Sequence, residues 1–405
     1  MAALTDYLAW RGDIDFSAVP PNEVDSLIFS QIIYLDFSGI VPESKSEKGV
    51  TLLAAMKQYL KLRRGEKKTS LGALIPKEII LLATHAARSK RFGSLYLNGF
   101  INKIDEEDQS QFCAMTFNLG KQEKYIVFRG TDDTIVGWKE SFNMSFMLPI
   151  PAQLEALKYV NESADTFNGT IYIGGHSKGG NLAVFSATEA DEQIKPRIKA
   201  VYNNDGPGFT REFIESEKYL QVRDRIQTFV PESSIVGMLL EHEESYEVVK
   251  STQSGIFQHN ALSWEVMGGA FIHLDTVTKE SKRIDVDLKK WLASMESEER
   301  KSFLDTVYEI LVSTNAKTLS DLSADKLKLV KAWNALDDDS KKLIKRCIKT
   351  LLISSKKDKE QPESADGSVI AASAEKPNPK KRCARTGSPA SSRCNCDPKK
   401  IKGKK

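Results

Sequence analysis

The sequence predicts an α/β fold, in which a mainly parallel sheet is flanked by helices and followed by a C-terminal helical region and a disordered basic tail. Short β-branched or alternating runs take turns with helical stretches between residues 111 and 250, which is typical of parallel strands joined by right-handed crossovers. The chain has 405 residues, of which 40% are hydrophobic and 28% charged. This length and composition are ordinary for a globular protein with a large core.

The first hundred residues are predicted to be mostly helical. Apolar side chains recur at helical spacing in residues 25–37, 48–68 and 76–87, the pattern of helices that bury one face. Residues 92–100 then lead towards the sheet. We therefore expect a helical layer to precede the strands.

The sheet is predicted to begin with a hairpin and to continue with parallel strands. Residues 111–118 and 124–128 are short alternating or apolar runs separated by Gly120, which is a hairpin pattern. Strands and helices alternate beyond them. The expected helices are 151–167 and 179–189, and the expected strands are 170–173, 198–202, 226–230 and 246–250.

The composition changes in the C-terminal part of the chain. Residues 283–354 keep a helical pattern, whereas those from 356 onwards are rich in Ser, Pro, Lys and Ala with almost no large apolar side chain. Such a segment cannot bury enough apolar surface to order itself. The predicted organisation is a domain over 1–282, a helical extension over 283–355 and a disordered basic tail over 356–405.

The net charge of +3 conceals a difference between tail and body. Residues 376–405 contain eleven Lys or Arg and one acid, a charge of +10, so the residues before them sum to +3 − 10 = −7. The body therefore gives no support to nucleic-acid binding, and the tail suits an anionic partner. The N-terminus lacks a secretory pattern and no run approaches 18 apolar residues, so we expect a soluble, cytoplasmic protein.

The five cysteines do not predict a disulfide framework. Cys113 lies in an alternating strand pattern, as a buried thiol would. Cys383, Cys394 and Cys396 lie in the tail with no nearby His as the fourth ligand that zinc requires. We expect no metal site and no cofactor.

The segment IYIGGHSKGGNLAVFSA contains the strongest chemical motif. It runs from a strand through Gly175-His176-Ser177-Lys178-Gly179 into a helix rich in small residues, which is the context that the Gly-x-Ser-x-Gly motif of α/β-hydrolases requires. Ser177 is therefore the predicted nucleophile. The alternative is that the glycines only permit close packing or bind an anion at the helix N-terminus.

A second segment, KYIVFRGTDD, resembles the Phe-Arg-Gly-Ser/Thr turn of the class 3 lipases. That resemblance implies an oxyanion hole in which the hydroxyl residue, here Thr131, acts with the backbone N–H of Lys178. Trp138 follows at a distance where that family also has a Trp. The alternative is a capped turn that opens a helix, with Thr131 or Asp132 as N-cap.

The general base must be one of five histidines. His259 is the prediction, because it follows the last expected strand and the chain order Ser, acid, His is usual on this fold. His242, in a helical-looking segment, is second, and His273 is expected to be structural. His176 adjoins the nucleophile and is expected to face the wrong way.

Two residues compete for the acid of the triad. Asp205 follows the strand 198–202, whereas Glu232 follows the next strand, in the segment that resembles the acid-bearing loop of class 3 lipases. An acid after either strand can reach the base. Asp205 is favoured, with Glu232 as the alternative; a turn residue is the other interpretation of Asp205.

Seven segments also resemble an uncharacterised bacterial family of lipase-like α/β-hydrolases, the Mbeg-like family, over roughly residues 6–267. They are YLAWRGDIDF, EVDSLIFSQIIYLDF, FRGTDDTIVGWKE, GGHSKGGNLA, NNDGPGF, PESSIVGMLLEH and QHNALSWEV. The resemblance implies a serine esterase or lipase that acts on an ester or lipid substrate through an acyl-enzyme. The alternative is a catalytically silent scaffold that binds a partner or an anionic surface through its helical region and tail.

Overall fold

The computed structural model describes residues 2–63, 75–132, 134–314 and 316–318, with single residues at 321, 333, 334, 336, 338, 341, 342, 344 and 345. The predicted disordered tail over 356–405 lies outside the described residues, as does most of the predicted helical extension beyond residue 318.

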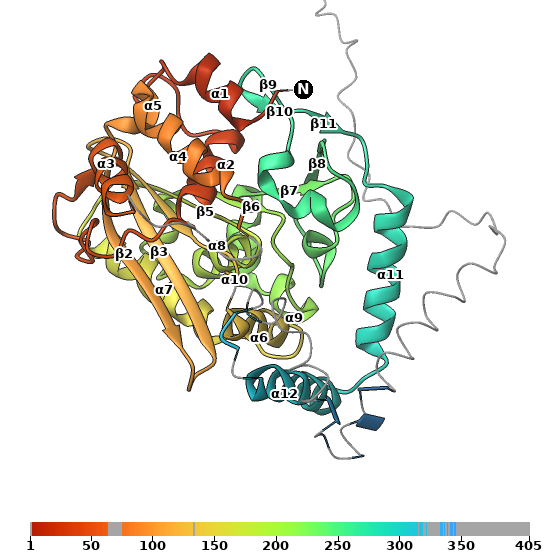
Figure 1. The fold of residues 1–405 in the computed structure, drawn as a ribbon. Coiled ribbons are helices and arrows are strands. Elements are labelled where there is room, and N and C mark those ends of the chain that lie inside the picture. The colour runs from red at the N-terminus through yellow and green to blue at the C-terminus, as the bar shows by residue number, and fades with distance from the viewer. Residues whose placement is uncertain are drawn as a thin grey trace, which may run out of the picture. The chain divides into compact units, whose positions relative to one another are not determined.

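A nine-stranded sheet forms the centre of the described chain (Figure 1), with the strand order β1-β2-β3-β4-β5-β6-β7-β8-β11. The strands from β4 to β8 are parallel neighbours, and the pairs at both edges are antiparallel. The predicted α/β fold class is confirmed. The bounds are β1 Val50–Thr51, β2 Tyr96–Asp105, β3 Ser110–Asn118, β4 Glu123–Phe128, β5 Thr170–His176, β6 Ile198–Asn204, β7 Ile226–Pro231, β8 Tyr246–Val249 and β11 His273–Leu274.

Side chains of the central strands are buried on both faces of the sheet. In β3, Cys113 and Met115 join one apolar cluster, whereas Phe112 and Ala114 join another. Successive strand residues point to opposite faces, so a strand with both sets buried is covered on both sides. The predicted hairpin is β3 and β4, which pair antiparallel.

The N-terminal helices cover one face of the sheet, as predicted (Figure 1). The first two begin the chain, α1 Leu4–Arg11 and α2 Glu23–Ile32; α3 Leu52–Leu62, α4 Glu78–Arg88 and α5 Lys90–Gly93 follow. Asn22 caps α2 by accepting from the Asp25 backbone N–H at 2.9 Å, and Asp25 reaches back to the Asn22 N–H. This reciprocal capping fixes the start of the helix that packs on the central strands.

Helices from the second half of the fold cover the other face. The helix α7 Pro151–Asp165 has Pro at its first position, and α8 Lys178–Glu189, α9 Arg211–Ile214 and α10 Glu217–Val222 complete the layer. A short antiparallel pair, β9 Val266–Met267 and β10 Ala270–Phe271, lies outside the main sheet.

Two helices represent the predicted C-terminal extension in the described residues, α11 Lys279–Ala293 and α12 Ser297–Ser313. α12 packs on α6 Ile135–Asn143, where Lys139 Nζ binds Asp305 at 2.6 Å. No described helix is long and apolar enough to cross a membrane.

Three local predictions are wrong. The helix expected over residues 25–37 ends at Ile32, and the chain turns beyond it. The helix expected from residue 48 starts at Leu52, because Val50 and Thr51 pair with β2 and the Thr51 side chain caps the helix. The helical-looking segment around His242 contains no helix over residues 239–245, because an isolated bridge pairs Glu241 with Phe209.

Candidate active site

The candidate site lies where β5 ends and α8 begins. Ser177 stands between them with φ 59° and ψ −133°, a conformation that costs a residue other than glycine about 1–3 kcal/mol. A strained turn of this kind lifts the Ser hydroxyl above the sheet in the Gly-x-Ser-x-Gly motif. The Ser177 backbone N–H donates to the Asn204 carbonyl at 2.9 Å, which ties the turn to the end of β6.

Gly175 and Gly179 are required by the close approach of two backbones. A Cβ on Gly175 would lie 2.2 Å from the carbonyl carbon of Gly179, and one on Gly179 would lie 2.2 Å from the Phe128 carbonyl oxygen. The close packing that the sequence offered as an alternative is therefore present. It occurs together with the strained Ser177 between the two glycines.

His259 and Asp205 form a hydrogen-bonded pair. The ring Nδ1 of His259 lies 2.7 Å from Asp205 Oδ2; the Asp205 side chain is 0% exposed and the His259 side chain 28% exposed. Asp205 Oδ1 also accepts from Ser234 Oγ and from the Gly237 N–H. Because a carboxylate only accepts, His259 carries its proton on Nδ1, and in the neutral ring Nε2 keeps a lone pair.

The predicted site residues lie beyond the carboxyl ends of parallel strands, where sheet folds of this class gather their sites. Ser177 follows β5, Asp205 follows β6, and Thr131 lies in the loop after β4. His259 ends the short 3-10 helix Gly255–His259 in the connection after β8. Asp205 takes a positive φ of 51°, which Asp adopts more readily than most residues.

The loop that carries His259 is fixed by its neighbours on both sides. Buried Trp264 donates through Nε1 to the Gln258 carbonyl at 2.9 Å. The Gln258 side chain accepts from the Ser233 N–H at 2.7 Å and donates to the Gln253 carbonyl at 2.8 Å. These contacts fix Gln258, the residue directly before His259, to the segments on both sides.

Glu232, the alternative acid, is not brought to His259. Its backbone N–H donates to the Val249 carbonyl at 3.1 Å, and its carbonyl accepts from the Thr278 N–H at 2.7 Å. Among the described residues, no hydrogen bond or ion pair joins the Glu232 side chain to a histidine. The structure thus brings Asp205, and not Glu232, to the predicted base.

His176 binds the backbone of the loop that carries His259. Its Nε2 lies 2.9 Å from the His259 carbonyl oxygen, so Nε2 carries the proton and donates. Burial, with a further contribution from nearby His259, lowers the pKa of His176 to about 3, which keeps the ring neutral. His176 was expected to face the wrong way to act as the base of Ser177, and its link to His259 was not anticipated. Adjacency to Ser177 was the only signal in the sequence.

The remaining histidines have other partners. His242 Nδ1 lies 3.0 Å from Glu244 Oε1. His273 in β11 lies 2.9 Å from Glu23 and 3.0 Å from Glu247. The ligand atoms of His273, Glu23 and Glu247 lie within 4.8 Å of one another, close enough to hold a metal ion, but both ring nitrogens already face a carboxylate. The tail cysteines lie outside the described residues.

The loop after β4 does not cap α6 in the way that the sequence suggested as an alternative. The N-cap is Thr134, whose Oγ1 accepts from the Gly137 N–H at 3.1 Å, and Asp132 accepts from the Thr134 N–H at 2.9 Å. Thr131 Oγ1 instead contacts Ser141 Oγ at 2.5 Å. The backbone N–H of Lys178 is the first of α8 and has no carbonyl partner within the helix.

The Lys178 side chain turns away from the site into the interior. Its Nζ binds Glu140 Oε2 at 2.5 Å and the Gln111 carbonyl at 2.7 Å, with 1% of the lysine and 0% of the glutamate side chain exposed. Glu140 also accepts from the N–H groups of Gln111 and Ala152. This pair, which the sequence did not predict, joins the start of α8 to α6.

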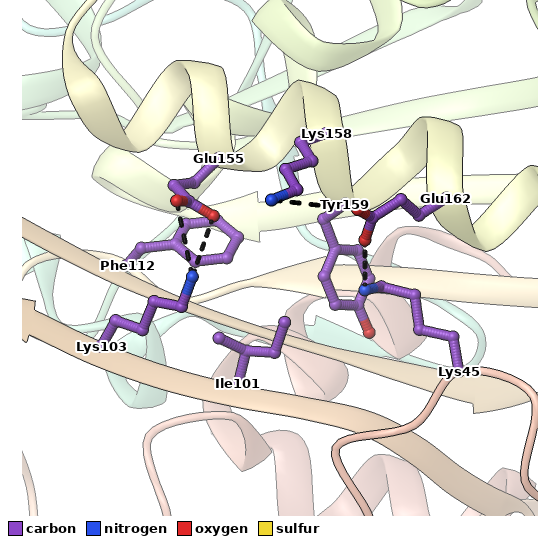
Figure 2. A pocket seen from close by; sticks show the side chains of 8 residues that line it. All are labelled: Lys45, Ile101, Lys103, Phe112, Glu155, Lys158, Tyr159 and Glu162. Atoms are coloured by element: carbon purple, nitrogen blue, oxygen red, sulfur yellow. Dashed lines mark hydrogen bonds and ion pairs between the residues drawn. The ribbon is translucent and has the colours of Figure 1, made fainter.

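A separate surface hollow shares no residue with the candidate site (Figure 2). Its charged residues pair with one another, since Lys45 binds Glu162 at 2.8 Å and Lys103 binds Glu155 at 3.3 Å. Its lining residues are Lys45, Ile101, Lys103, Phe112, Glu155, Lys158, Tyr159 and Glu162.

Comparison with solved structures finds seven matching chains, among them lipases. The native propeptide complex of Rhizomucor miehei lipase is 20% identical, with 42% of this chain and 58% of that chain covered and a TM-score of 0.30. M37 lipase is 15% identical, with 54% and 70% covered and a TM-score of 0.33. This chain thus spans less than two thirds of the Rhizomucor miehei enzyme. No curated protein matches.

The model of one protein family matches residues 86–309, which is more than half of the chain. The matched range contains the strained turn at Ser177, the hydrogen-bonded pair of His259 and Asp205, and the loop that carries Thr131. The chain belongs to the Mbeg1-like family.

Proposed function

We propose that the protein is a serine hydrolase that cleaves carboxylic esters through an acyl-enzyme. The observation that carries this proposal is the hydrogen bond of 2.7 Å between His259 and buried Asp205, beyond the same end of the sheet as the strained Ser177. A nucleophile, a base and a residue that orients the base are the three roles that this chemistry needs.

In the first step, the Ser177 hydroxyl oxygen attacks the ester carbonyl carbon while its proton moves to His259 Nε2. The tautomer with Nδ1 protonated suits this step, because Nε2 is then the basic atom. The imidazolium that forms is stabilised by the Asp205 carboxylate. The negative charge on the former carbonyl oxygen is to be met by hydrogen-bond donors, of which the Lys178 backbone N–H is one and Thr131 is the predicted other.

In the second step, the tetrahedral intermediate breaks its bond to the alcohol oxygen, and His259 returns the proton to the departing alcohol. The acyl group stays on Ser177. Water then attacks the acyl carbon as His259 takes one of its protons, and the Ser177 oxygen leaves with that proton. The products are one alcohol and one carboxylic acid, and the site returns to its starting state.

Exposed apolar side chains beside the proposed base favour an acyl or lipid substrate. Ile256 and Phe257 precede His259 in the same 3-10 helix and are 57% and 71% exposed. Large apolar side chains in such positions are suited to contact with an apolar ligand. We propose this substrate class together with a cytoplasmic location.

A fluorophosphonate probe applied to the full chain tests the proposal. We expect labelling of the wild type at Ser177, shown by mass spectrometry, and hydrolysis of p-nitrophenyl esters. Ser177→Ala should lose both, whereas Ser186→Ala should keep both. Ser186 is buried in the same helix, and within the described part of the chain its hydroxyl donates to the Ala183 carbonyl alone. An unlabelled wild type, or equal labelling of Ser177→Ala, would contradict the proposal and favour the silent scaffold.

A further inference from the structure

The hydroxyl of Tyr34 lies beside the proposed nucleophile. A Cβ placed on Gly130 would lie 2.5 Å from the Tyr34 hydroxyl oxygen and 3.1 Å from Ser177 Cβ. The same point is 2.6 Å from the His176 carbonyl oxygen. The Tyr34 phenol and the turn at Ser177 therefore both lie against Gly130, where only a residue without a side chain fits.

The fold holds Tyr34 in this position. Tyr34 follows α2, and its backbone N–H donates to the Gln31 carbonyl at 3.2 Å. The helix is fastened to the central strands through Ser26, which contacts Tyr125 at 2.9 Å and Asn204 at 3.0 Å. Only 9% of Tyr34 is exposed, so its ring has little freedom to move.

The Thr131 hydroxyl proton is already engaged. Ser141 Oγ lies 2.9 Å from the Gly137 carbonyl oxygen, which can only accept, so the Ser141 proton points there. The contact between Thr131 Oγ1 and Ser141 Oγ then requires the Thr131 proton. The Thr131 hydroxyl therefore has no proton left for an oxyanion unless this chain of hydrogen bonds breaks.

We propose that Tyr34 is a further catalytic residue, which donates a hydrogen bond to the oxyanion next to the Lys178 backbone N–H. This inference rests on the proposed function. The phenol keeps its proton throughout, so the contact changes no bond in the reaction. It stabilises the negative charge only as that charge develops, which is what accelerates the chemical step.

The surroundings of Tyr34 keep the phenol protonated. Burial raises its pKa well above the ordinary value, and the charge of nearby Asp132 adds to that rise. Arg129 and the backbone N–H of Gly130 act in the opposite direction. The Gly130 N–H faces the phenol oxygen, which leaves the phenol proton as the donor.

Steady-state hydrolysis of a p-nitrophenyl ester by the full chain tests this role, with Tyr34→Phe, Thr131→Val and Tyr202→Phe compared. Tyr202→Phe is the control, because it removes the same hydroxyl group from a tyrosine that does not lie beside Ser177. The Tyr202 hydroxyl donates to the Pro21 carbonyl at 3.0 Å. We expect Tyr34→Phe to lower kcat about 10²- to 10³-fold with little change in KM, the loss typical of one oxyanion donor. Thr131→Val should lower kcat less than about tenfold, because the hydroxyl that it removes already binds Ser141 and the Thr131 backbone N–H is kept.

The thermal unfolding midpoint of each variant separates catalysis from folding. Tyr34→Phe should melt like Tyr202→Phe and label more slowly with the fluorophosphonate probe. If Tyr34→Phe keeps kcat within about twofold of wild type, where loss of one oxyanion donor would cost far more, the role of Tyr34 is overturned. If Ser177→Ala is inactive in the same assay, the proposed function still stands. A wild type that neither labels nor hydrolyses the ester overturns both.

Discussion

The buried ring of His176 donates through Nε2 to the backbone carbonyl of His259 at 2.9 Å, and the two ring centroids lie 4.6 Å apart. The residue before the nucleophile thus supports the loop that carries the proposed base. The ring Nδ1 of His176 is buried and has no hydrogen-bond partner among the described residues. Protonation of His176 would place a positive charge beside His259, and the new Nδ1 proton would have no acceptor among the described residues.

The first prediction concerns the dependence of stability on pH. The pKa of His176 is about 3 in the folded chain and about 6.5 in an unfolded one, so between these values the unfolded state binds more protons. Stability from this residue is therefore complete above about pH 6.5 and is lost as pH falls towards 3. We expect His176→Phe to make the unfolding free energy less dependent on pH between about 4.5 and 6.5.

Urea unfolding at several pH values measures this slope. His85→Gln is the control, because His85 lies on the exposed side of α4. The same slope in wild type and His176→Phe would show that His176 does not titrate as its surroundings predict. Above pH 7, His176→Phe should still be less stable by about 1–3 kcal/mol, because the His259 carbonyl loses its donor.

The second prediction separates the two acids of the sequence interpretation. Asp205→Asn should lower kcat by about 10⁴-fold, because an amide favours the wrong tautomer of the base. Glu232→Gln should leave kcat within about twofold, since its side chain contacts no histidine in the described residues. Ester hydrolysis by both variants is the measurement. A larger loss in Glu232→Gln than in Asp205→Asn would assign the acid to the other loop.

Local sequence patterns predicted the elements that lie next to one another in the chain. The strand before Ser177 and the helix after it were visible because apolar periodicity and glycine spacing are local. Asp205 and His259 could be proposed from chain order, but their pairing depends on how far β6 and the His259 loop converge in space. The pattern could not rank Asp205 securely over Glu232 for this reason.

Contacts between distant segments were not predictable. Tyr34 lies in the turn after α2, and nothing in its spacing differs from that of a core aromatic. The helical pattern around His242 was misleading, because Glu241 pairs with Phe209 instead of continuing a helix. Tertiary pairing overrides local propensity in such short segments.

The third prediction concerns the exposed apolar pair beside the proposed base. Phe257→Ser should leave kcat for a short-chain ester within about twofold, because most of this side chain is exposed. It should raise KM for a long-chain ester about tenfold or more, since burial of one aromatic ring contributes about 1.5–3 kcal/mol. Leu81→Ser, on exposed α4 surface, is the control. A long-chain KM in Phe257→Ser equal to that of the wild type would contradict the proposed contact.

The fourth prediction concerns the buried ion pair of Lys178 and Glu140. Removal of one partner leaves an unpaired charge in the interior, so Lys178→Met and Glu140→Gln should each lose about 3–5 kcal/mol of unfolding free energy. The double variant Lys178→Met with Glu140→Gln should lose less than the sum of the single losses, because neither charge then remains. Urea unfolding gives the four values of this double-mutant cycle.

The matched control is the exposed pair Lys103 and Glu155 (Figure 2), whose side chains are 55% and 36% exposed. Lys103→Met should change the unfolding free energy by less than about 1 kcal/mol, because solvent screens that pair. Since Lys178→Met keeps the backbone N–H, the folded fraction should still label at Ser177. A loss in Lys178→Met no larger than in Lys103→Met would mean that the buried pair does not hold α8 against α6.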